Sequence, residues 1–342
     1  MKPRDGRRPV VIVHGRVEES ASPDEKDVLI EVDLVRSALQ ALGHQTVVVP
    51  VSLNLEEAVH ALKAAAPLLA FNLAESIDGR GSYIHFAPTL LDNLGIPYTG
   101  CSCEAILLTS HKLLGKKILE REGIPTPAWT TAVSAVSSGP GFAPPWIVKS
   151  VWEHASVGLE DSSVTSNREA LADEIGRRTQ RERLEQLFVE AYVEGREFNL
   201  AMLGGTEDGE PQNLPPAEIQ FVGYPEGKPK MVGYRAKWAE GSYEFDHTPP
   251  AYDFPDEDRG LVDSLVSISR ACWKAFDLRG YARVDFRVDA AGRPWVLEVN
   301  ANPCLSPDAG FVAAAARAGL LVEDIIRRIV ADATSAGGRG CS

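Results

Sequence analysis

The sequence predicts an α/β protein that begins with a parallel sheet covered by helices. Three observations predict this class. Strand, helix and strand patterns alternate near the N-terminus, the first strand is an uninterrupted apolar run, and the chain has 342 residues. That length corresponds to about two domains of ~150 residues, so the chain can bury a large core. Strand–helix–strand units are typical of parallel sheets.

The first strand is predicted at Val10–Val13. A helix follows at Asp27–Leu42, where apolar residues recur every three or four positions, and Gly43 ends it before a second strand at Thr46–Val49. This first unit closes near Tyr98–Gly100. The same reasoning places three more elements in it, a helix at Leu55–Ala66, a strand at Leu68–Asn72 and a helix at Tyr83–Leu94. A plain nucleotide-fold domain without activity of its own would show the same pattern.

A second unit is predicted to begin at Ser110, which has the chemistry of a helix N-cap. Its helix runs to Glu120, and Gly123 ends it. Farther along, Gly223–Asp253 lacks a sustained period, and a loop of that length inside an enzyme is usually functional. The elements between are a loop at Ser137–Pro145, a strand at Trp146–Lys149, a loop at Ser150–Gly158, a helix at Asn167–Arg183 and a strand at Leu187–Val189.

Composition excludes several classes of function. The net charge of −13 disfavours binding to nucleic-acid backbones or anionic membranes. The five cysteines are an odd number without CxxC pairs, which excludes a disulfide framework and a structural zinc site and favours the cytoplasm. No apolar run approaches the ~20 residues of a membrane helix, and the run at Val10–Val13 is too short for a signal peptide. The tail Ser335–Ser342 is expected to be flexible.

The most informative segment is a hairpin, YARVDFRVDAAGRPWVLEVNANP, at Tyr281–Pro303. Alternation places Arg283, Asp285 and Arg287 on one face of the first strand, and Val296, Glu298 and Asn300 on one face of the second. Strands paired in register would bring two carboxylates, a carboxamide and an arginine together. Hard oxygen ligands of this kind suit Mg²⁺. The alternative is a solvated strand face that carries charge pairs.

The hairpin resembles the metal-binding hairpin of the ATP-grasp superfamily, in its D-alanine–D-alanine ligase branch. The resemblance runs from about Leu68 to Leu321 and rests on ordered motifs. These motifs are NLGIPYTG at 93–100, HKLLGKKILEREGIPTP at 111–127, IVKS at 147–150 and LFVEAYVEGREF at 187–198. It implies an ATP-grasp fold, in which two α+β units follow an N-terminal parallel-sheet (pre-ATP-grasp) domain. The implied boundaries are residues 1–109, 110–197 and 198–334, with a tail at 335–342.

The resemblance also implies how ATP is held. Lys112 and Lys149 match lysines that contact ATP phosphates, which suits a compact ammonium. Glu190 matches a carboxylate that accepts from the adenine amino group, and Glu197 matches one that accepts from the ribose. The backbone of Ala191, Tyr192 and Val193 would lie at the base edge, and the loop that carries Glu153 and Ser156 would cover the phosphates. Without the motifs, Lys112 could simply be solvated and the glutamates could be strand-end charges.

The metal ligands implied by the resemblance are Asp285, Glu298 and Asn300, which would hold Mg²⁺ or Mn²⁺. Arg283 matches the cation that stabilises charge during phosphoryl transfer. Lys237 lies in a segment that resembles the lid over the active site, although it could also be an exposed loop lysine. Cys304 follows Pro303 where the family has glycine, and its N–H can serve an oxyanion hole whatever the side chain. A small buried side chain is the alternative for this cysteine.

The implied activity is that of a ligase. ATP phosphorylates a substrate carboxylate, and a second substrate's amine attacks the acyl phosphate to form an amide. The partners are therefore small-molecule carboxylates and amines, amino acids among them, and family members often form homodimers through the N-terminal domain. The alternatives are a relative that joins other amino acids or a metabolite carboxylate, and a nucleotide-binding protein that has lost catalysis.

Departures from the family pattern gather at the substrate end. Ala155 stands where the family has serine, and Trp238 stands where the lid has tyrosine. Neither side chain can reproduce the hydrogen-bonded link that these residues form around the first D-alanine. Glu18 or Glu19 could supply the N-terminal glutamate of that link, and Asn72–Glu75 lacks the usual His-Gly. These departures favour a substrate other than D-alanine.

Overall fold

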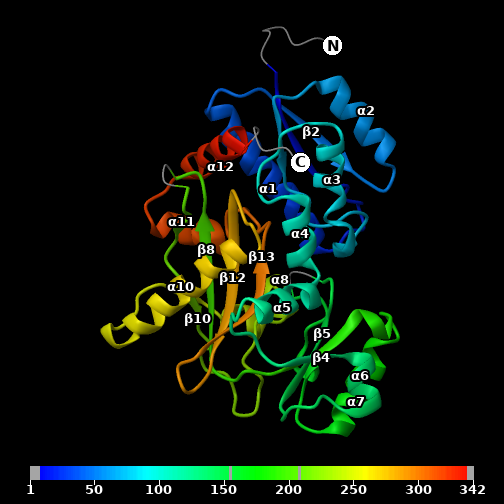
Figure 1. Cartoon of the computed structure of the whole chain (residues 1–342), viewed down its shortest axis with the longest axis vertical. Helices are drawn as coiled ribbons and strands as arrows, with labels where there is room; N and C mark the ends of the chain where they lie inside the picture. The colour runs from blue at the N-terminus through cyan, green and yellow to red at the C-terminus, as the bar shows by residue number, and fades with distance from the viewer. Residues whose placement is uncertain (1–7, 154–155, 207–208, 337–342) are drawn as a thin grey trace.

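The computed structural model describes residues 8–153, 156–206 and 209–336. The protein is elongated, as Figure 1 shows, with the N-terminal unit at one end of the long axis. A small sheet with two helices, α6 (Ala132–Ser138) and α7 (Arg168–Arg178), lies at the opposite end. A larger sheet, which contains the predicted hairpin, lies between them. The predicted α/β and α+β ATP-grasp architecture is thus the one observed.

The N-terminal unit has the predicted parallel sheet. Strand β1 (Val10–Gly15) lies between β2 (Thr46–Val51) and β3 (Leu69–Asn72) and runs parallel to both. Because side chains alternate along a strand, β1 faces two separate cores, with Val10 and Ile12 in one and Val11 and Val13 in the other. The helices of this unit are α1 (Pro23–Ala41), α2 (Leu55–Ala65) and α3 (Phe86–Asn93).

Helix α1 begins four residues before its predicted start. Ser22 and Glu25 form a capping box, and Pro23 takes the first helical position, where its missing N–H costs nothing. The helix ends as predicted before Gly43, whose φ of 85° suits glycine. The predicted helix at 83–94 is shorter, because a 3₁₀ turn at Gly81–Tyr83 precedes α3.

The helix predicted to have Ser110 as its N-cap begins one residue later than expected. Ser110 instead ends an unpredicted helix, α4 (Cys103–Ser110), and α5 (Lys112–Arg121) follows at once. His111 is the true N-cap, since its Nδ1 accepts from the N–H of Leu114 at 3.2 Å. The prediction placed the cap one residue too early because serine is the commoner capping residue. A histidine ring nitrogen can accept the same hydrogen bond.

The small sheet has the order β4-β7-β5-β6 and is antiparallel. Helix α7 ends at Arg178 instead of the predicted Arg183. Asn167, the residue at which the helix was predicted to begin, is its N-cap and accepts from the N–H of Ala170 at 2.9 Å. Helix α6 was not predicted and takes in the first two residues of the predicted loop at 137–145. The strands are β4 (Trp129–Thr131), β5 (Trp146–Ser150), β6 (Val164–Thr165) and β7 (Leu187–Ala191).

The larger sheet has the order β11-β10-β8-β12-β13, with β9 beside β8. The predicted loop at 223–253 contains two short helices, α8 (Tyr234–Trp238) and α9 (Tyr243–Asp246). The strands are β8 (Arg196–Leu203), β9 (Gln212–Asn213), β10 (Ala217–Ile219), β11 (Pro250–Ala251), β12 (Tyr281–Val288) and β13 (Pro294–Asn300).

Three further helices complete the C-terminal part, α10 (Arg259–Ala275), α11 (Gly310–Arg317) and α12 (Val322–Ala336). Helix α12 continues through two residues of the predicted tail, and residues 337–342 lie outside the described residues. None of the helices in the described ranges has both the length and the apolar character needed to cross a membrane.

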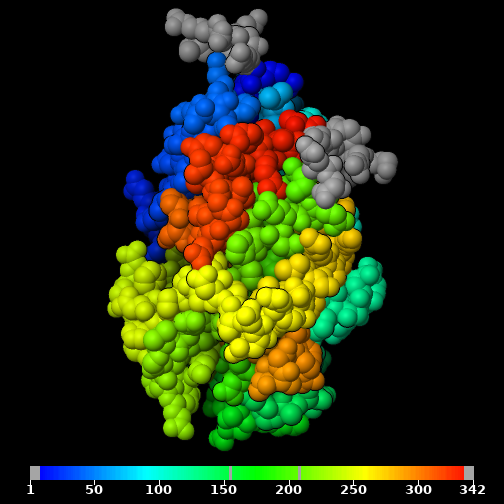
Figure 2. Space-filling model, turned by 90° about the vertical axis from the view of Figure 1, so that its left-hand side faces the viewer, coloured from blue at the N-terminus to red at the C-terminus, as the bar shows by residue number. Residues whose placement is uncertain are grey.

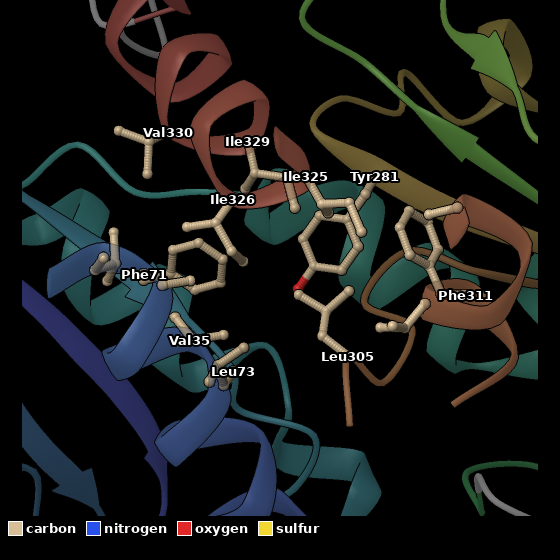
Figure 3. Close-up of a cluster of buried hydrophobic side chains, with 14 of the residues drawn as sticks. Val35, Phe71, Leu73, Tyr281, Leu305, Phe311, Ile325, Ile326, Ile329 and Val330 are labelled. Atoms are coloured by element: carbon tan, nitrogen blue, oxygen red, sulfur yellow. The ribbon is translucent and has the colours of Figure 1, made fainter. Parts of the chain in front are cut away.

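One buried cluster joins the two ends of the chain. Figure 3 shows Phe71 of β3 and Val35 of α1 beside Ile326 of α12, with Tyr281 of β12 and Phe311 of α11 completing the cluster. The two aromatic rings of Tyr281 and Phe311 meet edge to face at 5.6 Å. Figure 2 shows the C-terminal helices, in red, lying against the blue N-terminal unit. Because this core crosses the predicted boundary at residue 109, the division into units stays a prediction.

We expect Phe71→Ala to lower the free energy of unfolding by about 3–5 kcal/mol, because its ring is fully buried between two parts of the chain. Urea denaturation followed by circular dichroism measures this change. Leu68→Ala is the matched control, since Leu68 lies just before the same strand and is 40% exposed. Equal losses in the two variants would contradict the role of this core.

Candidate active site

The hairpin forms as predicted, with its two strands antiparallel. Arg283 lies opposite Asn300 and Asp285 opposite Glu298 on antiparallel strands. The prediction that Val296 shares their face is wrong, because the register shifts after Asp285 so that Leu297 is the extra residue of a β-bulge. The bulge turns Val296 into the apolar core and leaves both acidic side chains on the other face.

The acidic side chains of the hairpin are paired with cations. Arg283 donates to both oxygens of Asp285, at 2.7 and 2.8 Å, and Lys112 lies 2.8 Å from Glu298. Asn199 of β8 donates to Asp285 at 2.8 Å. Two carboxylates and the carboxamide of Asn300 on adjacent strands form a hard oxygen donor set, so these residues fit a divalent cation such as Mg²⁺.

Glu190 lies fully buried between two lysines. Lys149 of β5 donates to one carboxylate oxygen at 2.5 Å, and Lys116 of α5 pairs with the other. Burial acts to raise the pKa of Glu190, but the two ammonium groups outweigh it and the pKa is lowered. Lys116 also donates to Thr126 at 2.8 Å. This charge cluster joins α5 to the small sheet, next to the position predicted for adenine.

The segment after Glu190 includes a backbone N–H group without a backbone acceptor among the described residues. The N–H groups of Ala191 and Tyr192 donate to backbone carbonyls, whereas the N–H of Val193 has no backbone acceptor among the described residues. Arg287 holds this segment through the Val193 carbonyl at 3.0 Å and also lies 3.3 Å from Glu197. Burial raises the pKa of Glu197, and Arg287 opposes that shift.

Lys237 of α8 lies against the hairpin. Burial and the charge of Arg283 lower the pKa of Lys237, and the carboxylates of Asp285 and Glu298 oppose this shift. The same helix contacts the N-terminal unit, because Tyr234 donates to Asp24 at 2.9 Å. The segment predicted to be a lid therefore bridges two parts of the protein.

The loop predicted to cover phosphates contacts the same segment. Ser156 donates to the Val232 carbonyl at 2.7 Å. Burial raises the pKa of Glu153, and nearby Glu182 adds to the shift. Ala155, which the sequence analysis singled out, lies outside the described residues.

A group of acidic side chains lies where the N-terminal unit meets the segment after the hairpin. Glu31 accepts from the N–H of Leu305 at 2.5 Å, and the Cys304 thiol donates to Asp27 at 3.0 Å. Ligand atoms of Glu31, Glu75 and Cys304 all lie within 4.8 Å of one another. Burial and the acidic neighbours raise the pKa of the Cys304 thiol well above its usual value, so the thiol is protonated and is no nucleophile.

The N-terminal glutamates proposed from the sequence, Glu18 and Glu19, are exposed and lie before α1. The carboxylates that reach the site come from α1 itself and from the end of β3. Sequence reasoning missed them because α1 was read only for its apolar face. A signal existed in Asp27 and Glu31, which are spaced to share one helix face.

Three other residues of the site were also missed. Lys116 is four residues after Lys112 and so shares its helix face. Asn199 alternates with Glu197 along β8, so both lie on the same side of the sheet. Arg287 was placed on the correct face but without a role. Spacing could have found all three, whereas their partners come from other parts of the chain.

Comparisons with known proteins agree with this geometry. A family model described as D-ala D-ala ligase C-terminus matches residues 119–331. An uncharacterised protein of Sinorhizobium fredii is 31% identical over 303 residues, which cover 87% of this chain and 85% of that one. A D-alanine–D-alanine ligase of Gloeobacter violaceus is 31% identical over 322 residues, which cover 91% of this chain and 96% of that one.

A solved structure shares the fold. The D-alanine–D-alanine ligase from Bacillus anthracis complexed with ATP superposes with a TM-score of 0.71 at 20% identity. The superposition covers 97% of this chain and 99% of that one. At this identity the likeness establishes the fold alone.

We expect Glu75→Gln to remove part of the pH dependence of stability. Burial and the charge of Asp27 raise the pKa of Glu75 from 4.5 to about 7. The folded protein therefore binds more protons than the unfolded chain between these values, so its stability falls as the pH rises through this range. Urea denaturation at pH 5 and pH 8 measures the effect. An unchanged difference between the two pH values in the variant would contradict the assignment.

Proposed function

The chain belongs to the D-alanine–D-alanine ligase family, and from this premise we propose that it joins a carboxylate to an amine using ATP. One observation carries the proposal. The paired strands β12 and β13 bring Asp285, Glu298, Asn300 and Arg283 to one face, directly beside Lys112 of α5. A protein that only bound nucleotide would not require both carboxylates and the arginine at that place.

We infer that ATP lies between the small and the larger sheet. Its phosphates would contact Lys112 and Lys149, and its adenine would meet the free N–H of Val193 and the buried carboxylate of Glu190. Glu197, on the site face of β8, would accept from the ribose. In this structure Lys149 donates to Glu190. On nucleotide binding its ammonium group would contact a phosphate in place of this carboxylate. Glu153 and Ser156 would cover the phosphates from their loop.

Asp285, Glu298 and Asn300 would hold the divalent metal, Mg²⁺ or alternatively Mn²⁺. When bound, the metal would neutralise phosphate charge and align the γ-phosphate. Lys112 now pairs with Glu298, and the same ammonium would turn to the phosphates once that carboxylate is engaged. The side chains that now compensate each other's charge would thus become ligands of the nucleotide.

The proposed reaction has two steps. The substrate carboxylate attacks the γ-phosphorus of ATP, which releases ADP and leaves an acyl phosphate. The amine then attacks the acyl carbon, so that phosphate leaves and the nitrogen loses a proton. Arg283 and Lys237 would stabilise the charge that develops in these steps, and the Cys304 N–H would face the oxyanion. The lid contact between Tyr234 and Asp24 would help exclude water, which hydrolyses acyl phosphates.

We propose a substrate other than D-alanine, although relatives are named D-alanine–D-alanine ligases. Trp238 stands where the lid of the family has tyrosine, and the side chain of Cys304 would narrow the pocket beside the predicted oxyanion hole. The Cys304 thiol is also tied to Asp27, a carboxylate that faces the substrate end. The ATP end keeps the family pattern while the substrate end departs from it.

We expect magnesium-dependent ADP release from the purified protein with amino acids other than D-alanine. A panel of D- and L-amino acids, tested singly and in pairs with mass identification of the product, measures this. Activity with D-alanine alone would overturn the proposed change of substrate but keep the ligase. Binding of ATP without ADP release across a broad panel of carboxylates and amines would contradict the ligase assignment.

We expect Glu298→Gln to lower turnover by about 100-fold or more, because a metal ligand contributes several kcal/mol to charge stabilisation. The melting temperature should change little, since Glu298 lies at the cleft and outside the core. Glu169→Gln, an exposed change of the same kind on α7, is the control. Full turnover in Glu298→Gln, with an unaltered magnesium dependence, would refute the proposed metal site.

A further inference from the structure

Three carboxylates at the substrate end of the cleft have no salt-bridge partner among the described residues. Asp27 and Glu31 come from α1, and Glu75 follows β3. Arg283 and Lys237 both act on the charge of Glu75, but the guanidinium of Arg283 is bound to both oxygens of Asp285, and Lys237 also faces Asp285 and Glu298. In the described ranges none of the three carboxylates forms a salt bridge. We call Asp27, Glu31 and Glu75 the acidic chamber.

Glu31 shows that the acidic chamber is incomplete. Its residue is 2% exposed, and one carboxylate oxygen accepts from the N–H of Leu305. The other oxygen, Oε2, is buried and has no hydrogen-bond partner among the described residues. A buried polar atom without a partner costs roughly 1–3 kcal/mol, so a ligand that supplied a donor there would be favoured.

The cavity that Glu75 lines is also acidic. Its wall carries Asp24, Glu25, Glu75 and Glu153. Among the described residues of the wall, Arg16 is the one basic residue, and its guanidinium already pairs with Glu57. The negative surface is therefore continuous from the cavity to Glu75.

Such a site fits a cation, and an organic ammonium fits it better than a metal ion. The Cys304 thiol, which could be a metal ligand, instead donates a hydrogen bond to Asp27. An ammonium has three N–H donors, which match the free oxygen of Glu31 and its neighbours Glu75 and Asp27. The acidic wall also extends beyond the reach of a single ion. One α-ammonium would leave most of these carboxylates without a counter-charge.

We propose that the acidic chamber binds a second, non-reacting ammonium group, so that the enzyme takes a diamino acid as a substrate. This inference rests on the proposed ligase function and names its substrate class. The reacting carboxylate would lie toward Arg283, and the side-chain ammonium would lie between Glu31 and Glu75. A neutral side chain of the same length would leave the chamber without its cation.

The test compares matched ligands that differ only by an ammonium in place of a methyl group. Diaminobutyrate is compared with norvaline and ornithine with norleucine, each as both enantiomers. Calorimetry with magnesium ATP measures binding, and ADP release measures turnover. We expect the better diamino acid to exceed its neutral partner by about tenfold or more in binding and in kcat/KM, as charge-assisted recognition does.

Variants locate the effect. Glu31→Gln and Glu75→Gln should each reduce the preference for the diamino acid by about tenfold, while affinity for ATP stays the same. Glu56→Gln removes one charge from an exposed position on α2 and should leave the preference intact. Circular dichroism checks that each variant is folded. Two separate variants are used so that the test still stands if one of them does not fold.

Two outcomes would overturn the inference. Equal binding of the charged and neutral partners would exclude an ammonium site. A stoichiometric metal that is retained by the purified protein and lost in Cys304→Ser would show that the chamber holds a metal ion. Failure of the ligase function is a separate result, in which the diamino acid binds with the expected preference but no ADP is released.

Discussion

Compensation of buried carboxylate charge is the constraint on which the rest of the site depends. Strand pairing brings Asp285 against Glu298 on one face of a sheet whose other face is a hydrocarbon core. Two neighbouring carboxylates repel each other unless cations lie between them. Arg283 and Lys112 supply those cations, and each comes from an element that would also reach a bound nucleotide. If ATP binds as proposed, the side chains that now neutralise each other would also contact the nucleotide.

The buried cluster that joins the two ends of the chain determines where the proposed substrate end of the cleft lies. Phe71 and Ile326 belong to segments more than 250 residues apart, yet they pack in one cluster. This packing brings α1 and the end of β3 against the segment after the hairpin. Glu31 consequently meets the N–H of Leu305, and the acidic chamber forms at the contact. The apolar core thus creates a polar site at its edge.

Prediction from the sequence worked best where neighbouring residues determine the structure. The alternation of β12 placed Arg283 and Asp285 on the same face, and the parallel sheet followed from apolar runs separated by one helical segment. It failed at Ser110, where a histidine caps the helix, and at Val296, where a bulge shifts the register. In both cases the local sequence is compatible with two structures, a cap at Ser110 or at His111 and a strand with or without a bulge. The packing of other parts of the chain determines which of the two forms. The roles of the residues assigned to ATP and metal binding remain predictions.

The sequence by itself determined the family, the order of the elements and the face on which the hairpin carries its charges. Each of these follows from motif order and from a periodicity of two or 3.6 residues, which local spacing specifies. Only the tertiary structure decided that Lys116 and Lys149 enclose Glu190, and that Glu31 has an oxygen without a partner. These pairings join residues from separate elements, and their geometry depends on how buried surfaces pack. No pattern along the chain specifies which residues of separate elements come into contact.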